Sequence, residues 1–227
     1  AMLQVEAEIG ADRLIEADLR GIPSHGTRAL PRYCGDMDHG RIDPRAAILT
    51  ERETPAMAVL NGGKGLGHVA ATRGMELAIA KAREVGVGTV GVRNSQHFGA
   101  AAVYAMMAAR EGMIGYATTS TGPATVAAYG SRRPAVANNA LAWAAPTRDG
   151  KPIVLDFHGK AGVRVEPDMW VDEVIRENPS GYGYTMKDQV NERGYRSVTT
   201  PGTVAGLYKA LTEHGTMAWH EVVQPAI

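Results

Sequence analysis

The stretch GVGTVGVRNSQHFGAAAVYAMMAAREGMIGYATTS, residues 86–120, carries the clearest signal of how this chain folds. Residues 87–92 place valines among glycines and are typical of a short strand, and residues 113–118 form a second strand-like run. Residues 100–110, between them, favour a helix. A strand, a helix and a strand in succession predict an α/β domain.

The segments on either side continue this alternation. Residues 57–60 (MAVL) suit a buried strand, 70–85 show one apolar helical face, and 153–155 suit a further strand. Helices are expected at 2–20 and 30–38 before this region, and at 170–177 and 204–213 after it. The chain therefore divides into a helical segment (1–56), an α/β domain (57–160) and a C-terminal segment (161–227).

Composition narrows the class of protein. The 227 residues include 24 basic and 24 acidic side chains, so the net charge is zero and no nucleic-acid partner is expected. Cys34 is the only cysteine, which excludes an internal disulfide and fits a reducing cytoplasm. No apolar run approaches the roughly 18 residues of a membrane span, so no membrane partner is expected. We expect a cytoplasmic globular protein.

A Ser-His pair follows the first predicted helix. Gly21 and Pro23 favour an end to that helix, since glycine suits a C-terminal cap and proline cannot continue it. Ser24 and His25 come next, and three arginines lie within eight positions of the histidine: Arg20, Arg28 and Arg32. The segment is either a polar loop at a helix end or an acid–base centre with anion-binding side chains nearby.

Three further polar groups have two readings each. Residues 65–70 (GLGHVA) match G-x-G-x-x-A, a dinucleotide-binding pattern, but the acidic residue expected about 20 positions later is missing. A lone match of this kind is weak, and a glycine-rich turn that caps a helix is the preferred interpretation. Residues 93–99 (RNSQHFG) and 155–160 (LDFHGK) follow predicted strands, where ligands bind in α/β folds or where polar turns and helix caps occur.

Motifs of other enzyme classes are missing. The seven histidines form no H-x-x-x-H or H-E-x-x-H pair, and we expect no metal site. The sequence also lacks a G-x-S-x-G elbow, the signature of a serine hydrolase, and a G-x-x-x-x-G-K-[ST] phosphate loop, the signature of a nucleoside triphosphatase.

Four segments, in order along 11–157, together resemble the malate/L-lactate dehydrogenase family, which also holds sulfolactate and ureidoglycolate dehydrogenases. They are ADLRGIPSHGTRALPRY, residues 86–120, AYGSRRPAVANNALAWAAPT and PIVLDF. The resemblance implies a non-Rossmann α/β fold with a mixed sheet flanked by helices, NAD or NADP as cofactor, and a homodimer. It also implies hydride transfer between a small 2-hydroxy acid and its 2-oxo acid. A cyclic imino-acid reductase, or a non-catalytic member with a degraded cofactor site, are the alternatives.

The resemblance assigns roles by position. His25 would donate a proton to the substrate, Ser24 would orient His25, and His97 would line the pocket. The family's arginine, four positions after the histidine, is replaced by Ala29, which leaves Arg28 and Arg32 as partners for a substrate carboxylate. The residues implied for the cofactor are Asn94, Thr119, Ser120, Asn139, Asp156, Phe157, His158 and Gly202.

The chain departs most from the family after Phe157. Members of the family continue for well over a hundred residues, whereas 70 follow here. The segment 180–188 (SGYGYTMKD) faintly resembles a glycine-rich cofactor segment, and 199–203 (TTPGT) a late Pro-Gly turn. The C-terminal segment is therefore either incomplete in this sequence or shortened in the protein.

Overall fold

The computed structural model describes residues 1–120, 124, 126–127, 133–137, 139–157, 163–166, 168–178, 183–197, 199 and 202–226. The chain divides into two compact units, Ala1–Val154 and Leu155–Ile227. The N-terminal helices and the middle α/β region fall in the first unit. The three-part division expected from the sequence stays a prediction.

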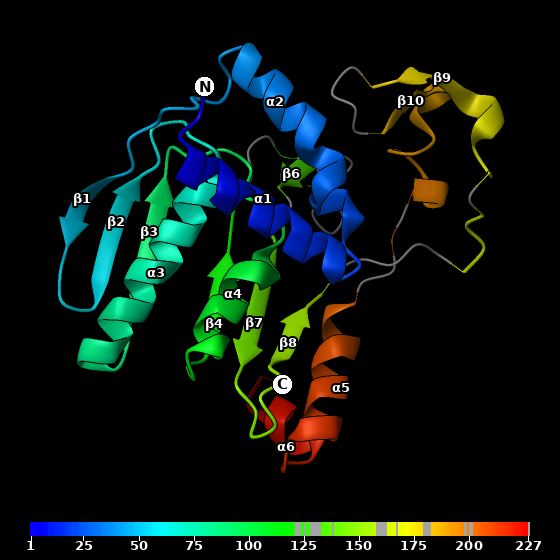
Figure 1. The fold of residues 1–227 in the computed structure, drawn as a ribbon. Helices are drawn as coiled ribbons and strands as arrows, with labels where there is room; N and C mark the ends of the chain where they lie inside the picture. The colour runs from blue at the N-terminus through cyan, green and yellow to red at the C-terminus, as the bar shows by residue number, and fades with distance from the viewer. Residues whose placement is uncertain are drawn as a thin grey trace. The chain divides into compact units, whose positions relative to one another are not determined.

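One mixed sheet contains strands β1 (Leu49–Glu53), β2 (Met57–Asn61) and β3 (Thr89–Arg93) in that order. β1 runs antiparallel to β2, and β2 runs parallel to β3. Helix α3 (Gly67–Val85) makes the crossover between the parallel strands and lies along this sheet (Figure 1). The crossover places the residues after β2 and β3 at one edge of the sheet.

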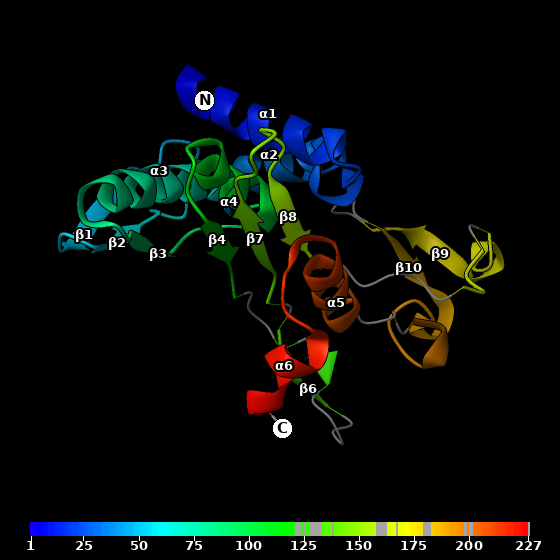
Figure 2. The same cartoon turned by 90° about the horizontal axis from the view of Figure 1, so that it is seen from below.

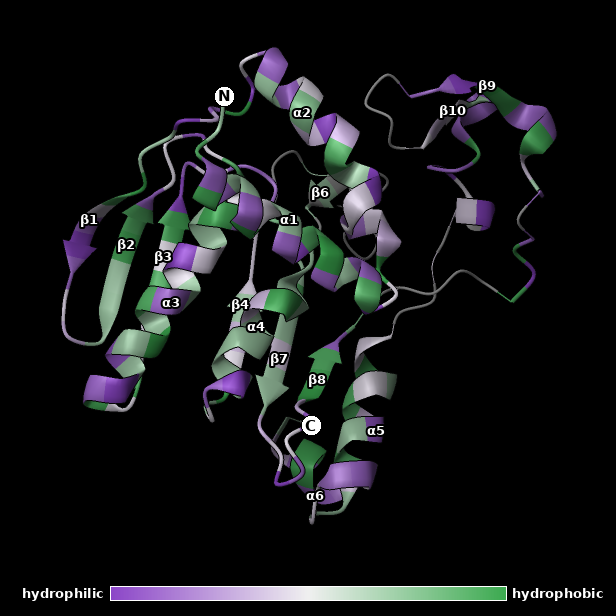
Figure 3. Ribbon diagram, in the orientation of Figure 1, coloured by the Kyte–Doolittle hydropathy of each residue, from purple (hydrophilic) through white to green (hydrophobic). Residues whose placement is uncertain are grey.

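A second sheet has the order β4 (Gly115–Thr118), β7 (Leu141–Ala145) and β8 (Ile153–Asp156). Helix α4 (Ala101–Arg110) packs on β4 and β7, as the turned view in Figure 2 also shows. The core between helix and strands is largely alanine, and α4 is apolar over most of its length (Figure 3). A Cβ on Gly115 would lie 2.0 Å from the Ala105 carbonyl oxygen, so helix and strand approach very closely.

The helix before the Ser-His pair ends in a hydrogen-bonded cap. In α1 (Gln4–Leu19), the Gly21 N–H donates to the Asp18 carbonyl at 2.9 Å and the Ile22 N–H to the Ala17 carbonyl at 2.9 Å. Gly21 has φ +73°, which completes the Schellman motif. The expected role of Gly21 is confirmed, and the chain then makes two 3₁₀ turns (Pro23–His25, Thr27–Ala29) before α2 (Leu30–Asp38).

The second unit contains a two-stranded antiparallel sheet, β9 (Val174–Glu177) with β10 (Tyr184–Met186), and helices α5 (Thr203–His214) and α6 (Trp219–Val223). The helix expected over 170–177 is therefore wrong. A 3₁₀ turn over Val171–Glu173 leads into β9 instead. Val171, Val174 and Ile175 are spaced i, i+3 and i+4, as on one face of a helix. Their β-branched side chains nevertheless favour a strand where a partner strand is present.

The other expected elements agree with the structure to within a few residues. The helices expected at 2–20, 30–38, 70–85, 100–110 and 204–213 are present, as are the four strands. The α/β class with mixed sheets and flanking helices is confirmed. Sequence reasoning did not predict β1, β7, α6 or the short pair β5 (Val126–Ala127) and β6 (Pro134–Val136). Among the described residues, no helix is both long and apolar enough to cross a bilayer.

Candidate functional site

Ser24 and His25 lie in the first 3₁₀ turn after α1, and both are half-buried. The Ser24 Oγ and the His25 Nδ1 are 2.9 Å apart, within hydrogen-bond distance. This contact fixes one nitrogen of the imidazole ring and sets its orientation. The two side chains are therefore in contact, and the roles that the resemblance implies for them stay predictions.

Gly26, the residue after His25, lies directly against the Asp18 carboxylate. The Asp18 Oδ2 accepts hydrogen bonds from the Thr27 backbone N–H at 2.9 Å and the Thr27 Oγ1 at 2.6 Å. These bonds lower the pKa of Asp18, the hydroxyl contributing most. A Cβ on Gly26 would lie 1.8 Å from the Asp18 Oδ1, so only glycine lets the carboxylate hold the loop.

His97 comes from the loop between β3 and α4, and two glycines bring this loop close to its neighbours. A Cβ on Gly67, at the start of α3, would lie 2.1 Å from the Gln96 carbonyl oxygen. Gly99 has φ +77°, and a Cβ there would lie 2.7 Å from the His68 Nε2. The structure thus explains Gly67 as a close contact between backbones, which supports the helix-start reading of 65–70 over a phosphate-binding reading.

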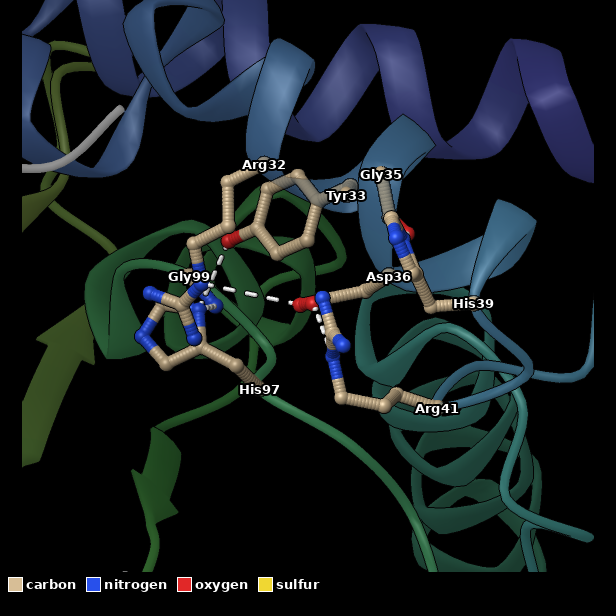
Figure 4. Close-up of polar contacts among 8 residues, drawn as sticks. All are labelled: Arg32, Tyr33, Gly35, Asp36, His39, Arg41, His97 and Gly99. Carbon is tan, nitrogen blue, oxygen red and sulfur yellow. Dashed lines mark hydrogen bonds and ion pairs between the residues drawn. The ribbon is translucent and has the colours of Figure 1, made fainter. Parts of the chain in front are cut away.

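The rings of His25 and His97 lie 5.5 Å apart between centroids, although 72 positions separate them in the sequence. Tyr33, from α2, places its hydroxyl 2.6 Å from the His97 Nδ1, and Figure 4 shows the two side chains pointing toward each other. Burial is the main reason that the pKa of His97 falls from 6.5 to about 4, and the charges of Arg32 and His25 add to it.

A third histidine, His68, is buried next to Tyr33, with 1% of its surface exposed. Its ring meets the Tyr33 ring edge-on, 5.1 Å between centroids, and neither ring nitrogen has a hydrogen-bond partner among the described residues. Burial, and after it the charges of nearby cationic groups, lowers the pKa of His68 from 6.5 to about 3. His68 is therefore neutral at physiological pH.

Of the two arginines expected to bind a substrate carboxylate, Arg32 lies near His97 and Arg28 is exposed. Arg32 is near enough to His97 to influence its titration, and its Nε is 3.7 Å from the Asp36 Oδ2 (Figure 4). Asp36 also accepts a hydrogen bond of 2.6 Å from the Arg41 Nε. Arg28 lies exposed on the second 3₁₀ turn. Ala29 is 2% exposed in the core with Leu14, so a longer side chain there would require repacking.

The residues expected to bind the cofactor fall into two sets. Ser120 and Asn139 are exposed where β4 ends and β7 is about to begin, and the Thr119 N–H donates to the Ala140 carbonyl at 3.0 Å. Asn94 is instead tied to its own sheet, since its side-chain amide donates to the Asn61 Oδ1 at 3.0 Å. The Ser120 hydroxyl and the Asn139 amide are suited to hydrogen-bonding a ribose or a carboxamide.

The second set belongs to the second unit. Asp156 and Phe157 are half-buried at the end of β8, and Gly202 precedes α5. The Phe157 ring packs on α5, where a Cβ on Gly206 would lie 2.2 Å from the Phe157 Cε1. His158 lies outside the described residues. Among those described, no group of three or more histidine, cysteine or acidic side chains is arranged to hold a metal.

Sequence reasoning missed Tyr33, His68 and Asp18. The contact of Tyr33 with His97 joins residues 64 positions apart, which no local pattern reveals. Tyr33 does lie eight positions after His25, about two helical turns away, on a segment already of interest. That spacing was the one signal available.

Two family models match this chain. The malate/L-lactate dehydrogenase model matches residues 2–158, and the gamma-glutamyltranspeptidase model matches residues 140–227. Their overlap, 140–158, includes the boundary between the two compact units at Val154 and Leu155.

Curated relatives resemble the first part of the chain. A malate dehydrogenase of Pyrococcus abyssi is 48% identical over 152 residues, which is 67% of this chain and 41% of that protein. An NADP(+) (2R)-3-sulfolactate dehydrogenase of Chromohalobacter salexigens is 36% identical, over 67% of this chain and 45% of its own length. An NAD(+) ureidoglycolate dehydrogenase of Escherichia coli O157:H7 is 34% identical, over 65% and 42%. The chain thus spans less than half the length of these relatives.

Solved structures share the fold. Malate dehydrogenase from Pyrococcus horikoshii OT3 aligns with a TM-score of 0.67 and 38% identity, over 83% of this chain and 52% of that one. Sulfolactate dehydrogenase from Methanocaldococcus jannaschii aligns with a TM-score of 0.69 and 30% identity, over 93% and 62%. The alignments confirm the expected family fold, and they extend into the second unit.

Proposed function

Because the chain belongs to the malate/L-lactate dehydrogenase family, we propose that it is an NAD(P)-dependent oxidoreductase that interconverts a small 2-hydroxy acid and its 2-oxo acid. The observation that carries the proposal is the hydrogen bond between Ser24 and His25, whose ring lies 5.5 Å from the ring of His97 between centroids. With Nδ1 in contact with Ser24, we assign the other ring nitrogen, Nε2, to the substrate oxygen.

The reduced nicotinamide, when bound, supplies the hydride. The residues of this chain bind and orient the acid and move the proton. His25 protonates the substrate oxygen on which negative charge develops, which contributes typically ~10²–10⁴-fold to the rate. Ser24 holds the His25 ring, and the Arg32 guanidinium beside His97 is the partner for the substrate carboxylate. Ser120 and Asn139 hold the cofactor at the end of β4.

The experiment is a screen of 2-oxo acids and cyclic imines with NADH and NADPH, followed by nicotinamide fluorescence. We expect His25→Ala to lower kcat by at least ~10² and to leave cofactor affinity nearly unchanged. His39→Ala, which removes an exposed imidazole at the end of α2, is the matched control. An equal loss of turnover and cofactor binding in His25→Ala would contradict the role of proton donor.

A second candidate is a non-catalytic member with an incomplete cofactor site. The gamma-glutamyltranspeptidase model over residues 140–227 favours it, since its overlap with the dehydrogenase model contains the boundary between the units. Under this candidate, residues 155–227 derive from a different family and supply no cofactor contacts. Neither NADH nor NADPH would then change its fluorescence on titration with the full chain, whereas the dehydrogenase proposal requires a response to at least one.

The homodimer and the cytoplasmic location expected from the sequence stay predictions. Light scattering of the purified chain tests the first directly.

A further inference from the structure

We infer that Tyr33 and the Gly99 backbone hold His97 as the neutral tautomer with its proton on Nε2, so that His97 is a fixed hydrogen-bond donor and Tyr33 its positioning residue. Its use in catalysis rests on the proposed function, but the tautomer itself does not. The inference assigns different tasks to the two neighbouring histidines.

The geometry at Nδ1 of His97 gives the direction of its hydrogen bonds. The Gly99 backbone N–H points at this nitrogen at 3.4 Å, and a backbone N–H can only donate. At 3.4 Å this donor is weak, so it biases Nδ1 toward a lone pair rather than a proton but does not fix the tautomer by itself. The Tyr33 hydroxyl, 2.6 Å from the same nitrogen, then also acts as a donor to it. With Nδ1 accepting, the proton of the neutral ring is on Nε2.

The surroundings keep this ring neutral. His97 is half-buried, and the Arg32 guanidinium and the His25 ring nearby both disfavour a positive charge on it. These effects bring the pKa of His97 to about 4, well below physiological pH. Two further polar neighbours, the Tyr33 hydroxyl and the Gly99 N–H, already donate to the ring.

Tyr33 is held firmly enough to impose the tautomer. Its side chain is 2% exposed, and its ring meets His68 edge-on at 5.1 Å. The Arg32 guanidinium lies 5.8 Å from the same ring's centroid. The Tyr33 and His97 rings are nearly parallel, 25° apart, with centroids 6.0 Å from each other. A buried phenol packed on several sides has few alternative rotamers.

The consequence is a division of labour at one substrate oxygen. His25 gives up a proton during turnover, whereas His97 donates a hydrogen bond from Nε2 and keeps its proton. A fixed donor of this kind stabilises charge that develops on the oxygen without a change in its own protonation. Tyr33 touches neither substrate nor cofactor in this account and acts through His97.

The test is nitrogen-15 NMR of the histidine side chains in the full chain without cofactor, with the His97 signals assigned from His97→Gln. At pH 7 we expect the shift of an unprotonated Nδ1 and a protonated Nε2. Tyr33→Phe keeps the ring in the core and should convert His97 to a mixture of tautomers. Tyr104→Phe, which removes another buried phenol that donates to the Phe98 carbonyl, is the matched control and should keep the single tautomer.

A protonated Nδ1 in the parent, or an unchanged His97 spectrum in Tyr33→Phe, would overturn the inference. Turnover provides the second readout: Tyr33→Phe should lower kcat about tenfold, the effect of one hydrogen bond, with cofactor affinity unchanged. If the parent has no dehydrogenase activity, the proposed function fails, but the NMR result still decides the tautomer.

Discussion

Two histidines with lowered pKa values, the buried His68 and the half-buried His97, should make the first unit sensitive to mild acid. The pKa values of His68 and His97 fall from 6.5 to about 3 and about 4 in the folded protein, so both rings remain neutral when the unfolded chain binds protons. The unfolded state therefore gains protons as the pH falls below 6.5, and stability decreases with it. Stability stops decreasing only when the pH reaches the pKa values of the two histidines in the folded protein, about 3 and about 4.

The size of the effect follows from these shifts. Between pH 7 and pH 5 each histidine lowers the free energy of unfolding by about 2 kcal/mol, or roughly 4 kcal/mol together. This is a large share of the about 5–15 kcal/mol that stabilises a typical domain. Because His97 is only half-buried, its share is the more easily reduced by solvent screening.

Urea unfolding at pH 7 and pH 5, followed by far-ultraviolet circular dichroism, measures this difference. His68→Leu removes one of the two groups and should reduce the pH dependence by about half. His39→Gln, which removes an exposed imidazole of the same unit, should leave it as in the parent. A change below about 1 kcal/mol in the parent, or equal pH dependence in parent and His68→Leu, would refute the reasoning.

Two further predictions concern the loops that hold the histidines. Gly67→Ala places a methyl group 2.1 Å from a carbonyl oxygen and should lower the free energy of unfolding by more than about 2 kcal/mol, whereas Gly35→Ala, in α2 with nothing within 4 Å, should be neutral or stabilising in the same urea assay. Asp18→Ala removes both hydrogen bonds to Thr27 and should lower kcat more than it lowers stability, which parallel kinetics and unfolding will show; a fall in stability alone would mean that the loop keeps its geometry without Asp18.

The sequence predicts elements whose pattern is strong in itself. Gly21 and Pro23 set the end of α1 correctly, because the left-handed φ of the cap needs glycine. β1 was missed because all five of its residues are exposed, so its side chains show no apolar alternation. β7 was missed because its alanines suit a helix as well as a strand. In both cases pairing with a neighbouring strand determines the structure.

The same distinction applies to the candidate site: residues adjacent in the sequence could be predicted, and contacts between distant segments could not. Ser24 and His25 are adjacent in sequence, and their motif made them visible. The approach of His97 to His25 was implied only by the family resemblance, and its contact with Tyr33 was not anticipated at all. Such contacts between distant segments depend on close backbone packing, for example of Gly67 on the Gln96 carbonyl, and a single sequence does not encode that distance in any local pattern.

The alanine-lined contact of α4 with β4 and β7 has an evolutionary consequence. Where a helix and a sheet meet mainly through methyl groups, few long side chains can rotate to absorb added volume, so replacement of these alanines by valine or leucine would push the helix away. The first residue of α4 lies four positions after His97, and the histidine would move with it. Selection for a well-packed interior would then also preserve the placement of this imidazole over many generations, with no direct selection on the ring.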